Sequence, residues 1–190
     1  MAQEIEAKVR IADPAAFRRQ MAERSESGGE TVFEDNRLFD DPAGTLRRRG
    51  AALRVREERP AGGGEPLRAT LAYKGPRAES ELKRREEIEI EVQAASPLVL
   101  IFEAMGLRET FRYEKRRSVW RVGECEIALD ELPHLGWFVE VEGPTERSVR
   151  AGLEALGLAD AELLSADYIH LLTERLKSLG LDPSRALFEA

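Results

Sequence analysis

Several segments of this chain alternate, residue by residue, between apolar and charged side chains. In the first, "EIEAKVRI" at residues 4–11, Ile5 and Val9 are interleaved with carboxylates, an ammonium and a guanidinium. Successive side chains of a β-strand point to opposite faces of the sheet, so such a segment is predicted to form a strand with one apolar and one charged face. Because the pattern returns on at least six segments, the chain is predicted to fold around a β-sheet.

The predicted strands are separated by turn-forming residues. Pro and Gly mark these turns, as in "DPAG" at residues 41–44 and "PAGGGEP" at residues 60–66. Eight strands are expected in all. After the first, they lie at residues 31–40, 51–58, 67–75, 84–92, 109–122, 124–132 and 137–143.

Four further segments have the spacing of amphipathic helices. At residues 13–23, Asp13 and Pro14 suit a helix N-terminus, and Phe17 and Met21 lie four positions apart on one face. A second helix is expected at 96–107, where Ser96 is placed as an N-terminal cap. The last two are expected at residues 145–158 and 165–180.

The succession of these elements favours an α+β fold. Antiparallel strand signals return regularly, with only two long helical segments before the C-terminal pair. This order indicates a closed or strongly curved antiparallel sheet, in effect a β-barrel, with helices packed outside. A length of 190 residues without a composition break predicts a single domain, residues 1–190.

Composition excludes several classes of protein. The 29 Lys and Arg residues against 36 Asp and Glu residues give a net charge of -7, which argues against a nonspecific nucleic-acid binder. Cys125 is the sole cysteine, so neither an internal disulfide nor a zinc site of several thiolates is expected. No run approaches the ~20 apolar residues of a spanning helix, so we expect no membrane association and a cytoplasmic location.

The charged faces are the strongest functional signal. One face of an antiparallel sheet is commonly solvated, and that interpretation suffices for any single strand. Here, however, the charges are sorted: Arg54 and Arg56 share one face, whereas Glu140 and Glu142 share another. Basic pairs suit a run of phosphates, and carboxylates suit hard divalent cations. If all these faces point inward, the interior is a polar channel that must be wet or filled, because unpaired buried charges are costly.

The charged segments carry short motifs in a definite order. After "EIEAK" come "ALRVRE", "TLAYKGP", "REEIEIEV", "EKRRSVW", "IALDELPHLGWFVEVEG" and "SADYIHLL". "EIEAK" resembles the ExExK signature of the CYTH superfamily, the triphosphate tunnel metalloenzymes, which include class IV adenylate cyclases, thiamine triphosphatases and inorganic tripolyphosphatases. The resemblance extends from residue 4 to about residue 172, and is strongest to the bacterial and archaeal class IV adenylate cyclase-like branch.

This resemblance implies a closed eight-stranded antiparallel barrel whose tunnel binds a triphosphate and a divalent metal, Mg²⁺ or Mn²⁺. The basic positions that match the family's phosphate ligands are Lys8, Arg54, Arg56, Lys74, Arg85, Lys115 and Arg117. The acidic positions that match its metal ligands are Glu4, Glu6, Glu87, Glu89, Asp130, Glu140 and Glu142. Three of these residues are placed in catalytic roles: Lys8, Glu87 and Glu142.

Some details stay open at this point. Strand alternation puts Lys115 and Arg117 on one face and Arg116 on the other, but a slip of one residue would invert this assignment. Leu38 stands where relatives often have an aromatic residue, which weakens the case for an aromatic contact to an organic group. Tyr168 is expected either to close one mouth of the tunnel or to pack in the core, and Cys125 is expected to be a small core residue.

The predicted function is metal-dependent hydrolysis of a triphosphate: inorganic tripolyphosphate, thiamine triphosphate or a nucleoside triphosphate. One alternative is a class IV adenylate cyclase that converts ATP to cyclic AMP and pyrophosphate. Another is a noncatalytic module that binds polyphosphate or nucleotides. The expected partner is a small triphosphate-containing molecule, and the helix-rich exterior would allow a homodimer.

Overall fold

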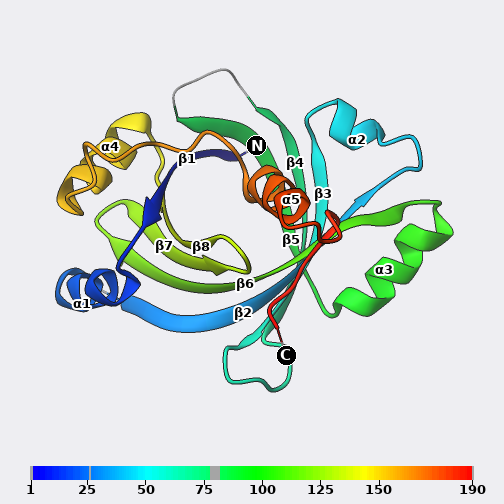
Figure 1. The fold of residues 1–190 in the computed structure, drawn as a ribbon, viewed down its shortest axis with the longest axis horizontal. Coiled ribbons are helices and arrows are strands. Elements are labelled where there is room, and N and C mark those ends of the chain that lie inside the picture. The colour runs from blue at the N-terminus through cyan, green and yellow to red at the C-terminus, as the bar shows by residue number, and fades with distance from the viewer. Residues whose placement is uncertain (1, 26, 78–81, 190) are drawn as a thin grey trace.

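Eight antiparallel strands form a strongly curled sheet in the computed structural model, which describes residues 2–25, 27–77 and 82–189, the side chains of residues 2–4, 77, 83 and 84 excepted (Figure 1). An α+β fold built on a strongly curved antiparallel sheet is thereby confirmed. The strands are β1 (Ala2–Ile11), β2 (Ser27–Asp40), β3 (Ala52–Pro60), β4 (Arg68–Arg77), β5 (Lys83–Val92), β6 (Arg108–Val122), β7 (Cys125–Leu132) and β8 (Gly136–Glu142).

The order of the strands across the sheet is β2-β3-β4-β5-β1-β8-β7-β6. The strands at the two ends of this order, β2 and β6, also pair with each other, from Ser27 opposite Arg121 to Asp40 opposite Arg108. This long pairing is interrupted by a bulge after Gly28 and by a second register shift after Leu38. A two-residue strand, β9 (Arg185–Ala186), adds to β6 in parallel.

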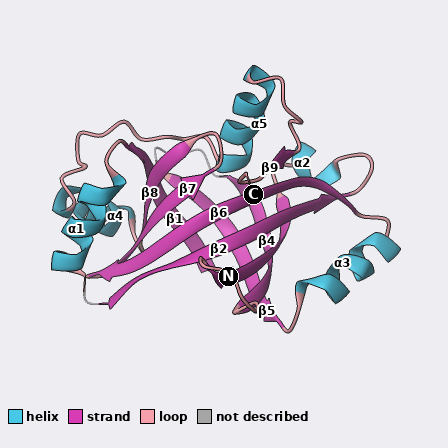
Figure 2. Cartoon of the chain, turned by 60° about the horizontal axis from the view of Figure 1, so that its bottom comes forward, coloured by secondary structure: helices cyan, strands magenta, loops and turns pink. Residues whose placement is uncertain are grey.

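Two helices cover one part of the outer surface. In Figure 2, α1 (Pro14–Arg24) and α4 (Glu146–Ala155) lie side by side at one end of the molecule. Phe17 and Met21 of α1 and Val149 of α4 share a cluster with Val9 and Ile5 of β1. Burying this apolar face stabilises the fold by roughly 25 cal/mol for each Å² of apolar surface removed from water. The apolar side of the first strand is therefore its outer side.

The other helices pack elsewhere. Phe102 of α3 (Ala95–Ala104) packs on the outer face of the sheet against Phe39 and Val55. A short α2 (Thr45–Arg48) follows β2, and α5 (Tyr168–Ser178) lies over the interior of the curled sheet (Figure 1), where its Tyr168 is in one cluster with Phe138.

Local sequence explains most helix starts. Asp13 accepts a hydrogen bond from the Ala16 amide at 2.8 Å and caps α1, as predicted. The expectation that Ser96 caps α3 is wrong, because that helix begins at Ala95 and its N-terminal cap makes no side-chain hydrogen bond. Cys125 is buried in the cluster under α4, in agreement with a core role. Within the described ranges, no helix has the length and apolar character needed to cross a membrane.

Candidate active site

A cavity inside the curled sheet is lined by every basic residue of the predicted phosphate-binding set. These side chains come from five strands, β1, β3, β4, β5 and β6, because alternate residues of each strand face the interior. Together they form the basic cluster: Lys8, Arg54, Arg56, Lys74, Arg85, Lys115 and Arg117. The choice within the "KRR" run is also resolved: Arg117 lines the cavity, whereas Arg116 pairs with Glu131 at 2.9 Å and stacks on the Phe188 ring.

A carboxylate that sequence reasoning missed lies among these cations. Glu34 of β2 is fully buried, with its Oε2 3.2 Å from Lys115 Nζ and 3.4 Å from Arg56 Nε. Its Oε1 is 3.7 Å from Arg117 Nε and has no hydrogen-bond partner. Burial alone would raise the pKa of Glu34, but the surrounding cations hold that pKa well below its usual value of 4.5. Glu34 is therefore an anion at neutral pH and neutralises part of the basic cluster.

Asp130 of β7 is the second buried anion of the basic cluster. Its Oδ1 accepts a hydrogen bond from Arg117 Nε at 2.7 Å, and its Oδ2 accepts one from Arg117 Nη2 at 2.6 Å. Lys115 Nζ lies 3.4 Å from the same Oδ2. Asp130 was predicted as a metal ligand, but the structure places its fully buried carboxylate among the basic side chains.

Lys115 has an unusual electrostatic environment. It lies between Glu34 and Asp130, with Arg117 on the same face of β6. Burial, with Arg117 nearby, lowers the pKa of Lys115 from 10.5 to about 8, although both carboxylates act in the opposite direction. Lys115, a predicted phosphate ligand, therefore loses its positive charge in mildly alkaline solution.

Three of the predicted metal ligands line the same cavity: Glu6, Glu140 and Glu142. Glu6 of β1 stands opposite Glu142 of β8 in the pairing register, and Lys8 stands opposite Glu140. Glu140 Oε1 is 3.1 Å from Lys8 Nζ, and its other oxygen bonds Arg117. The carboxylates thus form an acidic edge along β1 and β8, directly beside the basic cluster.

Two of the remaining predicted acids, Glu87 and Glu89, form ion pairs with basic residues of nearby strands. Glu87 is 2.8 Å from Lys74 Nζ and 3.7 Å from Arg54 Nη2. Glu89 pairs with Arg54 at 3.3 Å and with Arg68 at 3.2 Å. These two carboxylates of β5 therefore brace basic residues of β3 and β4. Glu4 pairs through its backbone opposite Arg85, but its side chain lies outside the described residues.

The donor chemistry of the acidic edge fits a hard divalent cation. Glu6, Glu140 and Glu142 offer only carboxylate oxygens, the ligands that Mg²⁺ and Mn²⁺ prefer. Among the described side chains, no three acidic, His or Cys groups are already assembled as a metal cage. A cation at this edge would therefore draw Glu140 away from its present ion pairs.

Tyr168, the first residue of α5, also lines the cavity. Its hydroxyl donates a hydrogen bond to Asp130 Oδ2 at 2.9 Å, and Lys8 Nζ lies 3.5 Å from the centre of its ring. Burial, together with the charge of Asp130, raises the pKa of Tyr168 well above its ordinary value, so the hydroxyl stays protonated. The sequence left its position open between the mouth of a tunnel and the core; the structure places Tyr168 in the lining of the cavity and in the buried cluster that contains Phe138.

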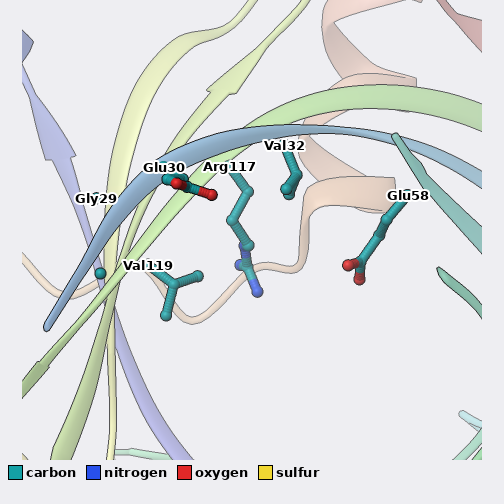
Figure 3. Close-up of a pocket in the computed structure, with 7 residues that line it drawn as sticks. Gly29, Glu30, Val32, Glu58, Arg117 and Val119 are labelled. Carbon is teal, nitrogen blue, oxygen red and sulfur yellow. The ribbon is translucent and has the colours of Figure 1, made fainter. Parts of the chain in front are cut away.

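A second cavity, of about 370 Å³, shares Arg117 with the first. Figure 3 shows the Arg117 side chain between Val32, Val119 and Glu58, which come from three strands. Gly28, Gly29 and Glu30, at the β2 bulge, complete its lining. Arg117 therefore lies where two cavities inside the curled sheet approach each other.

Comparisons with known proteins agree with this architecture. Residues 2–157 match the family model described as the CYTH domain. The adenylate cyclase CyaB of Aeromonas hydrophila is 28% identical over 186 residues, which cover 96% of this chain and 83% of that protein.

Two solved structures share the fold. A candidate adenylate cyclase from Vibrio parahaemolyticus superposes with a TM-score of 0.79 at 25% identity, covering 90% of this chain and 98% of that one. HpAC1 from Hippeastrum, whose structure is described as revealing a dominant triphosphatase activity, superposes with a TM-score of 0.66 at 20% identity, covering 94% of this chain and 97% of that one.

Proposed function

Because this chain belongs to the CYTH domain family, we propose that it binds a triphosphate in the cavity of the curled sheet and hydrolyses it with a divalent metal ion, Mg²⁺ or Mn²⁺. One observation carries the proposal: seven cations from five strands line a cavity beside the three glutamates of β1 and β8. A polyphosphate needs many cationic donors along its length, and its metal needs oxygen ligands at one edge. Anion binding alone would not require that acidic edge.

The cavity is proposed to be one end of a closed tunnel. The pairing of β2 with β6 joins the two ends of the strand order, and the second cavity, at Gly28, shares Arg117 with the first. Arg117, which lines both cavities, is held there by ion pairs with Asp130 and Glu140. Phosphate oxygens would take over the guanidinium from Glu140, so that substrate binding exchanges one set of charge contacts for another.

The chemistry follows from this arrangement. Phosphoryl transfer depends mainly on holding the phosphates in line and neutralising their charge. Arg54, Arg56 and Arg117 would bind phosphate oxygens through their planar guanidinium groups, with Lys74, Arg85 and Lys115 completing the clamp.

The acidic edge has the complementary role. Glu6, Glu140 and Glu142, with Glu4 on the same strand, would hold the metal ion, which neutralises phosphate charge and polarises the bond to be broken. Lys8 and Glu142 lie along this edge and are proposed to orient the attacking water. Glu87 is proposed to act by holding Lys74 and Arg54 in place.

A specific observation also favours a second candidate, cyclisation of ATP to cyclic AMP and pyrophosphate. Leu38, Ala52 and Ile169 give one part of the cavity an apolar lining that an organic group could contact. The relative from Aeromonas hydrophila carries the name adenylate cyclase. Hydrolysis is preferred because water needs no pocket for a nucleoside.

One experiment tests both candidates. Purified protein is incubated with tripolyphosphate, thiamine triphosphate or ATP in the presence of Mg²⁺ or Mn²⁺, and phosphate, pyrophosphate and cyclic AMP are quantified in parallel. Phosphate release that stops on chelation with EDTA is the expected result. Cyclic AMP from ATP would identify the cyclase instead, and tight metal-dependent binding without turnover of any substrate would indicate a noncatalytic module.

A further inference from the structure

Tyr168 touches two different parts of the proposed active site with two different parts of its side chain. It lies at the start of α5, a helix that contributes none of the predicted phosphate or metal ligands. The residue is 6% exposed, and its ring packs edge-on against Phe138 with 5.4 Å between ring centres. Helix α5 thus brings one aromatic side chain from outside the strands into the cavity.

The ring faces Lys8. The Nζ atom of this lysine lies 3.5 Å from the ring centre, a close cation–π distance, and 3.1 Å from Glu140 Oε1. An ammonium group on a flexible stem has many rotamers, and here the aromatic face and the carboxylate together select one of them. Lys8 is itself a residue proposed to act near the attacking water.

The hydroxyl reaches a different residue. It donates to Asp130 Oδ2 at 2.9 Å, and Asp130 in turn holds the guanidinium of Arg117 through both of its oxygens. Lys115 Nζ is also 3.4 Å from that Oδ2. A fixed Asp130 therefore fixes the orientation of the Arg117 guanidinium, which lines both cavities.

We propose that Tyr168 is a positioning residue of the active site, whose ring orients Lys8 and whose hydroxyl orients Arg117 through Asp130. This role rests on the proposed triphosphate hydrolysis, but the contacts themselves can be tested without turnover. It makes α5 part of the active site rather than only a cover over the sheet. Packing alone requires an apolar ring at this place; it does not require a hydroxyl bonded to the carboxylate that holds a phosphate ligand.

Three variants separate the two contacts from packing. Tyr168→Phe keeps the ring and removes the hydroxyl, whereas Tyr168→Leu removes both. Leu176→Ala serves as the matched control, since Leu176 is buried in the same α5 cluster. All three are measured for melting temperature, KM and kcat with tripolyphosphate, and for binding by calorimetry.

Loss of the hydroxyl is expected to change mainly KM, and loss of the ring is expected to change kcat as well. Tyr168→Phe raises KM about tenfold and leaves kcat within about threefold, because only the support of Arg117 is lost. Tyr168→Leu lowers kcat by a further factor of roughly ten, because Lys8 loses its aromatic face. Leu176→Ala lowers the melting temperature but keeps KM and kcat within about twofold of the wild type. If Leu176→Ala and Tyr168→Phe lowered the melting temperature by the same amount and also raised KM by the same factor, the proposal would be overturned.

A spectroscopic readout separates this proposal from the proposed reaction. In protein labelled with ¹³C at lysine Cε, the Lys8 signal, assigned by its loss in Lys8→Arg, should be shifted upfield by the ring current of Tyr168. The shift should persist in Tyr168→Phe and vanish in Tyr168→Leu. If it does so while the wild type hydrolyses no triphosphate, the positioning contact stands and the proposed reaction fails. An unshifted Lys8 signal in the wild type would refute the contact itself.

Discussion

Replacing Glu34 by Gln removes one of the two buried acidic charges that lie among the basic residues of the cavity. The substitution keeps the size of the side chain but takes one negative charge from among three cations, whose nitrogen atoms lie 3.2, 3.4 and 3.7 Å from its oxygens. Removing one partner of a buried ion pair typically costs about 3–5 kcal/mol, since the other charge is left buried without compensation. For a chain of this length, that corresponds to a fall in melting temperature of about 6–20 °C.

The loss should depend on pH with a definite sign. The folded-state pKa of Glu34 lies below its usual value of 4.5, so its contribution is complete above that value and is lost as the pH falls toward the folded-state pKa. The difference between wild type and Glu34→Gln in the free energy of unfolding should therefore be full at pH 7 and shrink in acid below about pH 4.5.

A polyphosphate should partly restore what Glu34→Gln loses, because its oxygens can neutralise the same cations. Urea unfolding followed by circular dichroism at pH 7, with and without tripolyphosphate, measures both effects. We expect tripolyphosphate to stabilise the variant more than the wild type. Glu103→Gln, which removes the same charge from the exposed side of α3, should stay within about 0.5 kcal/mol of the wild type. If Glu34→Gln were as stable as this control, the reasoning about the basic cluster would be refuted.

Four further changes test other parts of the molecule. Arg54→Ala should weaken tripolyphosphate binding about 10–100-fold by calorimetry, since it removes a cavity-lining guanidinium; unchanged affinity would mean that the substrate lies elsewhere. Glu142→Gln should lower kcat by at least about 100-fold with Mg²⁺ or Mn²⁺ while the circular dichroism spectrum is retained; full turnover would remove Glu142 from the acidic edge of the site. The affinity for tripolyphosphate should fall as the pH rises through about 8, because the neutral form of Lys115 then dominates. Lys115→Met should abolish this pH-dependent fall in affinity. A fall that persists in the variant would belong to the titration of another group. Gly28→Ala should lower the free energy of unfolding, measured in urea, by more than about 1 kcal/mol. The φ of Gly28 is +106°, and a Cβ there would lie 2.1 Å from the Val119 carbonyl oxygen, where β2 pairs with β6. An unchanged free energy of unfolding would show that the backbone at this pairing can shift at little cost.

The two-residue periodicity of the chain by itself determined the strands and the charged inner surface. A slip of one residue would turn the charges of "EIEAK" outward and leave Ile5 and Val9 off the cluster beneath α1 and α4, so the pattern admits one orientation. The seven basic positions that the family resemblance assigned to phosphate binding all line one cavity.

The pairing of each charge was decided only by the tertiary structure. Asp130 has the spacing of the acidic set, but the register of β6 and β7 places it opposite Arg117, where it accepts two hydrogen bonds. Glu34 lies in a segment of mixed character, so its place among three cations follows only from the pairing of β2 with both β3 and β6. Alternation along one strand says which face a side chain takes, but it does not say which strands are neighbours or at what register.

The contacts of Tyr168 also could not be predicted from the sequence. It follows Asp130 by 38 positions and lies on a helix, where strand periodicity carries no information. Its hydrophobic neighbours Leu172 and Leu176 mark the buried face of α5, and local sequence predicts no more than that. The sequence thus determined which charges face the interior, whereas the tertiary structure determined that Tyr168 contacts Lys8 and Asp130, because those contacts depend on how α5 packs against the sheet.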